Sequence, residues 1–252
     1  FGEATKVSAF LLDADKTYRV TARLGTATST GDADGGETVA TAPVPELSFD
    51  EWDRILQGFL GESLQVPPMY SALKKDGKRL YELARKGEVV EREARPIRID
   101  DISLLEAAGT RLVFRVTCSK GTYVRVLVED IAKAAGTVGH TARLHRESVG
   151  PFRATEMVDL AAVEALAAKD REALRAALLT PDVALQGMAA VEISTEDGAK
   201  FCGGQCVTGV PAENAGTVRV YAADKVFLGV GELSEEGALA PRRVFKASEK
   251  TL

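Results

Sequence analysis

Apolar and polar residues alternate along two stretches of the chain, residues 16–24 and 111–118. The apolar positions are Tyr18, Val20, Ala22 and Leu24 in the first stretch and Leu112, Phe114, Val116 and Cys118 in the second. A period of two residues is typical of a β-strand that buries one of its faces. Each stretch is therefore predicted to be a half-buried strand.

The second strand is predicted to lead directly into a helix. After the string Cys118-Ser119-Lys120-Gly121-Thr122-Tyr123-Val124-Arg125, apolar residues recur at helical spacing as far as Ala134, and Gly136 is placed to end the helix. Ser119 or Thr122 is predicted to cap the helix start, where free amides can face an anion. Arg125 lies in the first turn, where its charge opposes the helix dipole, which indicates a specific partner. The alternative is a purely structural joint with Arg125 in a surface ion pair.

Three further patterns complete the predicted secondary structure. Ser48 and Glu51 form a capping box before an apolar helical face that ends at Leu60, and residues 159–179 are an alanine-rich helical stretch with a break near Asp170. Residues 25–36 are predicted to be a loop, because Thr, Ser, Gly and Asp dominate them. After Pro181, short apolar runs separated by turns predict a small antiparallel barrel. The fold class is mixed α+β, with one large and one small domain.

Composition narrows the class of protein. The chain has 252 residues and a net charge of -5, and it has no apolar run of transmembrane length and no leader-like start, so we expect a cytoplasmic protein. Cys202 and Cys206 are the only cysteines near each other, and their spacing supports neither a disulfide framework nor a zinc site. His140 and His145, the only histidines, lack catalytic or metal-ligand spacing. The charge excludes a uniformly basic nucleic-acid binder, so any phosphate-binding patch must be local.

Such a patch lies between residues 74 and 98, where nine basic residues stand against five acidic ones, with Tyr81 among them and Tyr70 just before them. A basic segment that carries aromatic residues suits contact with a phosphate backbone. A solvated helix with Glu and Lys pairs explains the residues equally well.

The string from Cys118 to Arg125 resembles the arginine motif of the TruB type of bacterial tRNA pseudouridine synthases. Other segments resemble the same family over nearly the whole chain: residues 1–6, Asp32 to Gly35, the Pro67–Lys74 segment that opens an inserted RNA-gripping thumb, the strand around Leu144, and residues 229–243, which look like a PUA domain. The resemblance implies a synthase domain with a mostly antiparallel central sheet over residues 1–180, a thumb at about 70–98, and a barrel-like PUA domain over residues 181–252.

The resemblance also implies a reaction and its partners. The enzyme isomerises uridine 55 in the T-loop of tRNA by base flipping, glycosidic cleavage, rotation and rejoining through carbon. It needs no metal and no cofactor. The partner is the T-arm of tRNA, without a guide RNA and without a membrane, and the protein is expected to be a monomer.

The family's functional residues map onto this chain one by one. Arg125 is implied to be the ion partner of the catalytic aspartate, and Tyr18 to stack on the base and act in proton removal. Tyr18, Tyr123 and Leu144 are implied to line the uracil site. The implied RNA contacts are Lys6, Lys74, Lys75, Lys78, Arg79, Arg95, Arg146 and Arg242.

The catalytic aspartate itself is expected upstream of Phe1, because the string that begins at Phe1 follows the aspartate motif in the family. The chain as written is therefore expected to be inactive alone, with Asp32 and Asp34 as the only nearby substitutes. The alternative hypothesis is a non-catalytic tRNA-binding or tRNA-folding protein on the same scaffold. A third interpretation, in which the basic thumb docks a protein, has little support.

Overall fold

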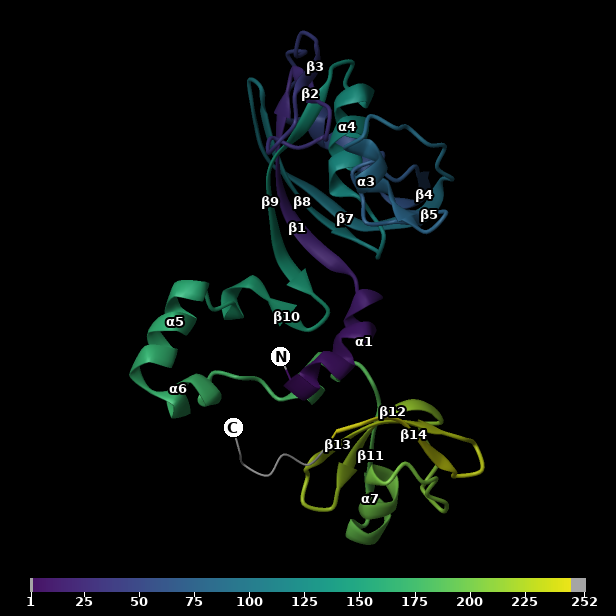
Figure 1. Ribbon diagram of the computed structural model, residues 1–252. Coiled ribbons are helices and arrows are strands. Elements are labelled where there is room, and N and C mark those ends of the chain that lie inside the picture. Colours follow the sequence, from purple (N-terminus) through teal and green to yellow (C-terminus); the bar gives the residue numbers. More distant parts are fainter. Residues whose placement is uncertain (1, 246–252) are drawn as a thin grey trace. The chain divides into compact units, whose positions relative to one another are not determined.

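The computed structural model describes residues 2–245 and shows a mixed α+β fold (Figure 1). These residues form two compact units. The sheet unit comprises residues 13–149 and 153–155, and the terminal unit comprises the described residues 2–12, 150–152 and 156–245. Along residues 2–245, no helix combines the length and the apolar character that a membrane crossing requires. The two units are each made of separate chain segments, so they do not correspond to domains divided at one residue. The predicted domain boundary at residue 180 therefore stays a prediction.

The sheet unit is built on a six-stranded sheet with the order β10-β9-β1-β8-β7-β4. The strands are β1 (Lys16–Leu24), β4 (Gly61–Gln65), β7 (Arg95–Ala108), β8 (Arg111–Cys118), β9 (Gly139–Val149) and β10 (Phe152–Arg153). β1 pairs antiparallel with β8 and β9, and β7 pairs antiparallel with β8 and β4. Both strands predicted from alternation, and the mostly antiparallel central sheet, are confirmed.

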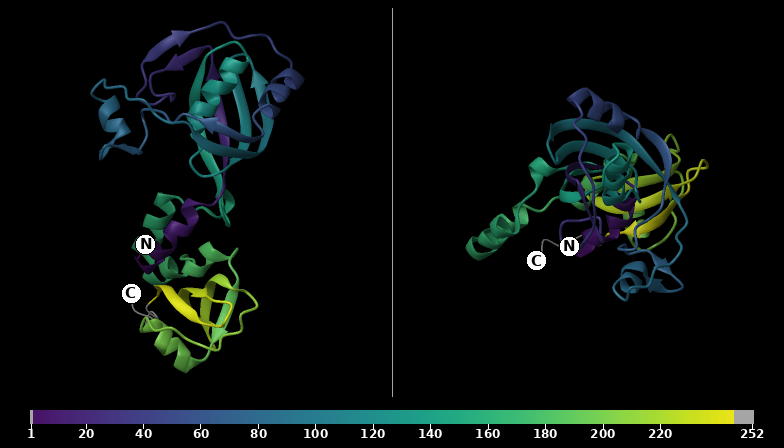
Figure 2. Two further views of the ribbon diagram at one scale, coloured as in Figure 1. Left: turned by 90° about the vertical axis from the view of Figure 1, so that its right-hand side faces the viewer. Right: turned by 90° about the horizontal axis from the view of Figure 1, so that it is seen from above.

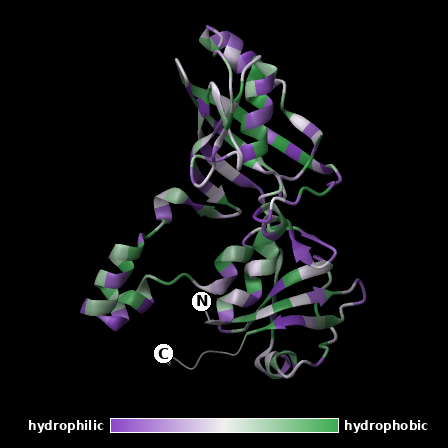
Figure 3. Cartoon of the chain, turned by 45° about the horizontal axis from the view of Figure 1, so that its top comes forward, coloured by the Kyte–Doolittle hydropathy of each residue, from purple (hydrophilic) through white to green (hydrophobic). Residues whose placement is uncertain are grey.

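Two helices cover one face of this sheet, α2 (Phe49–Gln57) and α4 (Val124–Ala134). The core joins Val20 and Phe114 of the strands to Leu56 of α2 and Leu127 of α4, all at most 1% exposed. Figure 2 shows α4 lying across the strands, and Figure 3 shows hydrophilic and hydrophobic residues alternating along the strands and around α4. The apolar residues that alternate along the strands and those that recur at helical spacing are therefore buried in the same core.

The capping box at the start of α2 is confirmed. The Glu51 N–H donates to Ser48 Oγ at 3.3 Å, and the Ser48 N–H donates to Glu51 Oε2 at 2.8 Å. The hydrogen bond from Ser48 lowers the pKa of the Glu51 carboxyl. The reciprocal bonds satisfy two amides that the helix leaves unpaired, so they fix the start of α2.

The basic segment is inserted between β4 and β7. It contains β5 (Lys74–Lys75), β6 (Lys78–Arg79) and α3 (Leu80–Ala84), and Figure 2 shows it standing away from the sheet. The turn between β5 and β6 has positive φ at Asp76 and Gly77, as two-residue hairpins with a type I′ turn require. We call residues 74–95 the basic hairpin.

A second hairpin follows β1. β2 (Thr26–Thr28) pairs antiparallel with β3 (Thr38–Thr41), so part of the predicted loop at residues 25–36 is a short strand. Composition missed β2 because threonine suits both loops and strands.

The terminal unit contains the four-stranded sheet β11-β12-β13-β14. The strands are β11 (Ala190–Ile193), β12 (Gly216–Ala222), β13 (Phe227–Leu233) and β14 (Leu239–Val244), and α7 (Thr195–Cys202) packs on them through Phe201. The predicted antiparallel barrel is wrong in two respects: over residues 2–245 this sheet is open, and β11 pairs parallel to β12. The apolar run of β11 is short and is followed by a helix, so its parallel pairing leaves no mark in the local sequence.

The remaining elements of this unit are helical: η1 (Gly2–Val7), α1 (Ser8–Leu12), α5 (Leu160–Lys169), α6 (Arg171–Ala176) and η3 (Pro181–Leu185). Asp159 caps α5, and Asp170 both ends α5 and caps α6. The helical stretch with a break near Asp170 is therefore confirmed. A separate short turn, η2 (Ala154–Glu156), joins β10 to the segment before α5.

Candidate active site

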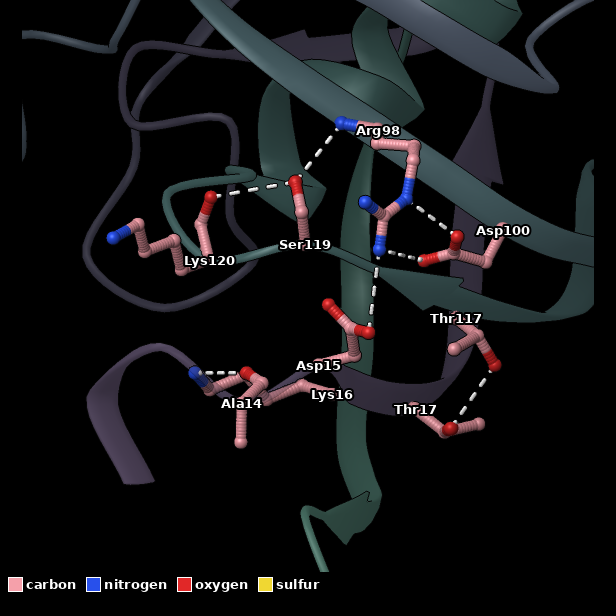
Figure 4. A network of polar contacts seen from close by, with 9 residues as sticks. All are labelled: Ala14, Asp15, Lys16, Thr17, Arg98, Asp100, Thr117, Ser119 and Lys120. Atoms are coloured by element: carbon pink, nitrogen blue, oxygen red, sulfur yellow. Dashed lines mark hydrogen bonds and ion pairs between the residues drawn. The ribbon is translucent and has the colours of Figure 1, made fainter. Parts of the chain in front are cut away.

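The turn between β8 and α4 is anchored to β7. The Ser119 N–H donates to the Arg98 carbonyl, and the Arg98 N–H donates to Ser119 Oγ, both at 2.9 Å. Figure 4 shows this anchor beside the ion pairs of Arg98 with Asp100 and Asp15. Gly121 has φ +80°, a conformation that favours glycine. The turn is thus fixed at its first residue and bent at its glycine.

The predicted cap of the following helix is wrong. Neither Ser119 nor Thr122 caps α4; the N-cap residue is Tyr123, and no side chain bonds its first amides as a cap. The Tyr123 main chain is held instead by the side chain of Gln65, the last residue of β4: the Tyr123 N–H donates to Gln65 Oε1 at 2.8 Å, and Gln65 Nε2 donates to the Tyr123 carbonyl at 3.2 Å. The hydroxyl of Ser119 accepts the Arg98 N–H of β7, so it does not accept an amide of α4.

Arg125 bonds two main-chain carbonyls. Its Nη1 donates to the carbonyl of Thr30 at 3.0 Å, and its Nη2 donates to the carbonyl of Tyr70 at 2.7 Å. No carboxylate within residues 2–245 forms an ion pair with it, so the predicted alternative of a surface ion pair has no partner there. Carbonyl oxygens orient the guanidinium, and the carboxylate that interacts with its charge is that of Glu129, one turn further along α4, which forms no ion pair with it. A half-buried cation held in this way is suited to an anionic group.

Tyr18, Leu144 and Arg146 share the face of the sheet that α4 covers. In the register of β1 and β9, Tyr18 lies opposite Arg146 and Val20 lies opposite Leu144. The Arg146 guanidinium lies 5.5 Å from the centroid of the Tyr18 ring, and Leu144 is 46% exposed. The structure therefore brings these three predicted residues together. They form an aromatic and apolar surface with a cation above the ring.

Asp32 and Asp34 follow Thr30, whose carbonyl Arg125 bonds. With Arg19, Thr21 and Arg143 they line a hollow of about 640 Å³. Arg19 and Thr21 alternate with Tyr18 and Val20 along β1, but Leu144 also lines this hollow, so the hollow adjoins the surface that Leu144 shares with Tyr18. Within residues 2–245, these two aspartates form no ion pair with Arg125.

Cys118 ends β8 at the head of the motif and is 1% exposed. Burial raises the pKa of its thiol to about 11, because the thiolate is poorly solvated there. A thiol of this kind is protonated at neutral pH. Cys118 is therefore a packing residue and not a nucleophile.

The basic hairpin presents free cations. The ammonium groups of Lys74 and Lys78 are exposed and have no hydrogen-bond or ion-pair partner within the described part of the chain. Lys75 donates to the Glu91 carbonyl at 2.6 Å, and the Arg79 guanidinium lies over the Tyr81 ring. Arg95 is exposed at the end of the hairpin. Arg98, which belongs to the same basic run, is instead ion-paired.

Two predicted RNA contacts, Lys6 and Arg242, belong to the terminal unit. Lys6 Nζ donates to the Val244 carbonyl at 2.8 Å, and Arg242 Nε lies 3.2 Å from a Glu232 carboxylate oxygen. Both cations thus have partners inside that unit. Their role in RNA binding stays a prediction.

Sequence reasoning missed the groups that hold the motif, namely the Gln65 amide and the carbonyls of Thr30 and Tyr70. A main-chain carbonyl carries no sequence signal. Gln65 stands just before Pro67-Pro68, but nothing local distinguishes it from a surface glutamine.

Comparison with known proteins places this chain in the class of the pseudouridine synthases. Models of this class match the chain in three segments: the TruB family pseudouridylate synthase N-terminal domain at residues 1–124, the tRNA pseudouridylate synthase B C-terminal domain at residues 125–186, and the pseudouridine synthase II TruB C-terminal domain at residues 189–245. The chain belongs to the TruB family of pseudouridylate synthases.

Individual relatives agree with this assignment. The chain is 47% identical to the tRNA pseudouridine synthase B of Nitrosococcus oceani, over 96% of this chain and 79% of the relative. It is 45% identical to that of Pseudomonas putida, over 98% of this chain and 81% of the relative. Among solved structures, a Cbf5-Nop10-Gar1 complex shares the fold with a TM-score of 0.70 at 22% identity, over 97% of this chain and 70% of that one.

Proposed function

We propose that the chain carries the base-binding and charge-pairing parts of a tRNA pseudouridine synthase that acts on uridine 55 of the T-loop. The observation that carries the proposal is Arg125, a half-buried cation oriented by two carbonyls and not hydrogen-bonded or ion-paired to a carboxylate in residues 2–245, where Glu129 interacts with it only electrostatically. An aspartate is the anion that such a site accepts, and we propose that it precedes Phe1. Membership of the TruB family and the tRNA named for the relatives support this substrate.

The residues of the site suit the separate steps of the reaction. The target nucleotide must leave the folded loop, and the exposed Leu144 and the Tyr18 ring offer an apolar and aromatic surface for the extruded base. Tyr123, at the N-cap of α4, is proposed to complete the pocket. Arg125 keeps the aspartate ionised and oriented toward the sugar or base, because a nearby fixed cation favours the charged form of a carboxyl. The Tyr18 hydroxyl is proposed to take part in proton removal after the base rejoins through carbon.

The partners follow from the same proposal. Lys74, Lys75, Lys78, Arg79 and Arg95 of the basic hairpin, together with Arg146, Lys6 and Arg242, are proposed to contact RNA. The hairpin favours recognition of the T-arm without a guide RNA. We further propose a monomer with a PUA-like terminal domain that acts in the cytoplasm.

A tritium-release assay tests the function. Unmodified tRNA with tritium-labelled uridine is incubated with the 252-residue chain and, separately, with a form that carries the preceding residues of its gene. Release from the longer form alone is expected. If neither form releases tritium while tRNA is still bound, the non-catalytic tRNA-binding hypothesis replaces this one.

The basic hairpin gives a second test, which measures binding. Replacing Lys74 and Lys78 together with alanine is expected to weaken tRNA binding and to reduce the slope of log affinity against log salt by about 1.4–1.8, if each ammonium neutralises one phosphate. The control is Lys133→Ala, since this residue is an exposed lysine of α4 outside the hairpin. An unchanged slope in the double variant would show that the hairpin does not bind the phosphate backbone.

A further inference from the structure

The Gln65 side chain is a buried polar group with two partners on one residue. It is 5% exposed, and its amide bonds both the N–H and the carbonyl of Tyr123, at 2.8 and 3.2 Å. A buried amide without such bonds is costly, so its orientation is determined by them. One side chain thus fixes the main chain of one residue in a single geometry.

That residue is the point where α4 begins. Tyr123 is the N-cap, and its carbonyl also accepts the Leu127 N–H at 3.1 Å, the first bond of the helix. No capping side chain stabilises this end of α4. The Gln65 amide is therefore the group that fixes where the helix starts and how its first turn is oriented.

The first turn of α4 carries the functional side chains. Arg125 lies two residues after Tyr123, and its Nη2 bonds the carbonyl of Tyr70, five residues after Gln65 in the chain. The stretch from Gln65, at the end of β4, to Tyr70 therefore holds this turn at two points, by the Gln65 side chain and by the Tyr70 carbonyl. A shift of the Tyr123 main chain moves the Arg125 guanidinium with it.

We propose that Gln65 is a positioning residue that sets the placement of Tyr123 and Arg125 for the reaction. This inference rests on the proposed synthase function. Gln65 does not touch the substrate; it acts through the main chain of Tyr123. Its loss is therefore expected to lower kcat with little change in KM for tRNA.

Gln65→Glu tests the proposal by pH. A protonated carboxyl has one donor and one acceptor and reproduces both bonds of the amide, whereas a carboxylate only accepts and repels the Tyr123 carbonyl. Burial favours the protonated form, so the acid is expected to titrate well above the usual range of Glu. The ratio of variant to wild-type kcat is expected to rise toward one as the pH falls from about 8 to about 5.5. At pH values where the introduced carboxyl of Gln65→Glu is ionised, kcat is expected to be about 10²-fold below wild type. A loss of this size is typical when a reacting group is displaced by about 1 Å.

Two further variants separate positioning from stability. Gln65→Leu cannot make either bond at any pH, so its ratio is expected to be low and independent of pH. Gln57→Glu is the control for introducing a carboxyl, because Gln57 Nε2 also donates to a main-chain carbonyl, that of Ile102 at 2.9 Å, but Gln57 is exposed and lies in another part of the unit. Its kcat ratio is expected to stay near one throughout.

The assay uses the form that releases tritium, with tRNA binding measured alongside. An active wild type with a Gln65→Glu ratio that does not change with pH, or that changes as much as in Gln57→Glu, overturns the positioning role alone. An inactive wild type overturns the proposed function, and the inference with it. A ratio that rises with falling pH in Gln65→Glu only supports the proposal.

Discussion

Tyr18→Leu is expected to release almost no tritium from tRNA while it still binds tRNA nearly as well as the wild type. Tyr18 lies on the α4-covered face of the sheet, opposite Arg146 and beside Leu144 in the register of β1 and β9. Leucine fills part of the volume but offers neither an aromatic face nor a hydroxyl, so base stacking and proton removal are lost together. General acid–base catalysis alone contributes about 10²–10⁴-fold. Single-turnover tritium release and filter binding, measured on the same preparation, give the two quantities.

Tyr18→Phe divides the two roles of this residue. Phenylalanine keeps the ring, and with it the contact to the Arg146 guanidinium at 5.5 Å, but it lacks the hydroxyl. If the hydroxyl acts in proton removal, the base is still cleaved and turned, but the final step is slow. If Tyr18→Phe and Tyr18→Leu lose tritium release to the same large extent, the loss is due to the missing hydroxyl. Normal turnover by Tyr18→Leu would remove Tyr18 from the mechanism.

The predictable part of the fold was the part governed by local pattern. Alternation predicted the extent and the buried face of β1 and β8, and helical spacing predicted α4. Both patterns succeed because each element buries one face against the same core. The capping box of α2 and the break at Asp170 also depend only on neighbours in sequence.

The rest depends on contacts between distant segments. Gln65 and Tyr123 are 58 residues apart, and Arg125 reaches Thr30 and Tyr70 across 95 and 55 residues. Such bonds have no spacing rule, so the sequence placed the cap of α4 on the wrong residues. The prediction of an all-antiparallel terminal sheet was wrong for the same reason. The relative direction of β11 and β12 depends on the segment that connects them, which here includes α7. The side chains of the candidate site were predicted from resemblance and stay a prediction, whereas the main-chain groups that hold Arg125 and Tyr123 were found only in the structure.

Under the proposed pairing of Arg125 with an aspartate, Arg125→Met is expected to lower kcat by about 10³-fold, because removing one partner of a desolvated ion pair costs about 3–5 kcal/mol. Without the guanidinium, the partner carboxyl loses the cation that favours its charged form, so its pKa rises. The reaction needs the ionised carboxylate, so the residual rate of the variant is expected to increase with pH over a range where the wild-type rate is already constant. The measurement is kcat against pH in the tritium-release assay.

Arg54→Met is the matched control, since Arg54 is an exposed arginine in the last turn of α2 and bonds neither Thr30 nor Tyr70. The carbonyls that Arg125 bonds are left without their donor in Arg125→Met, and the free energy of unfolding is expected to fall by about 1–3 kcal/mol. Urea unfolding measures that loss separately from kcat. Arg125→Met with a wild-type pH profile, whatever its stability, would show that the arginine supports the fold and does not set the charge of a catalytic carboxylate.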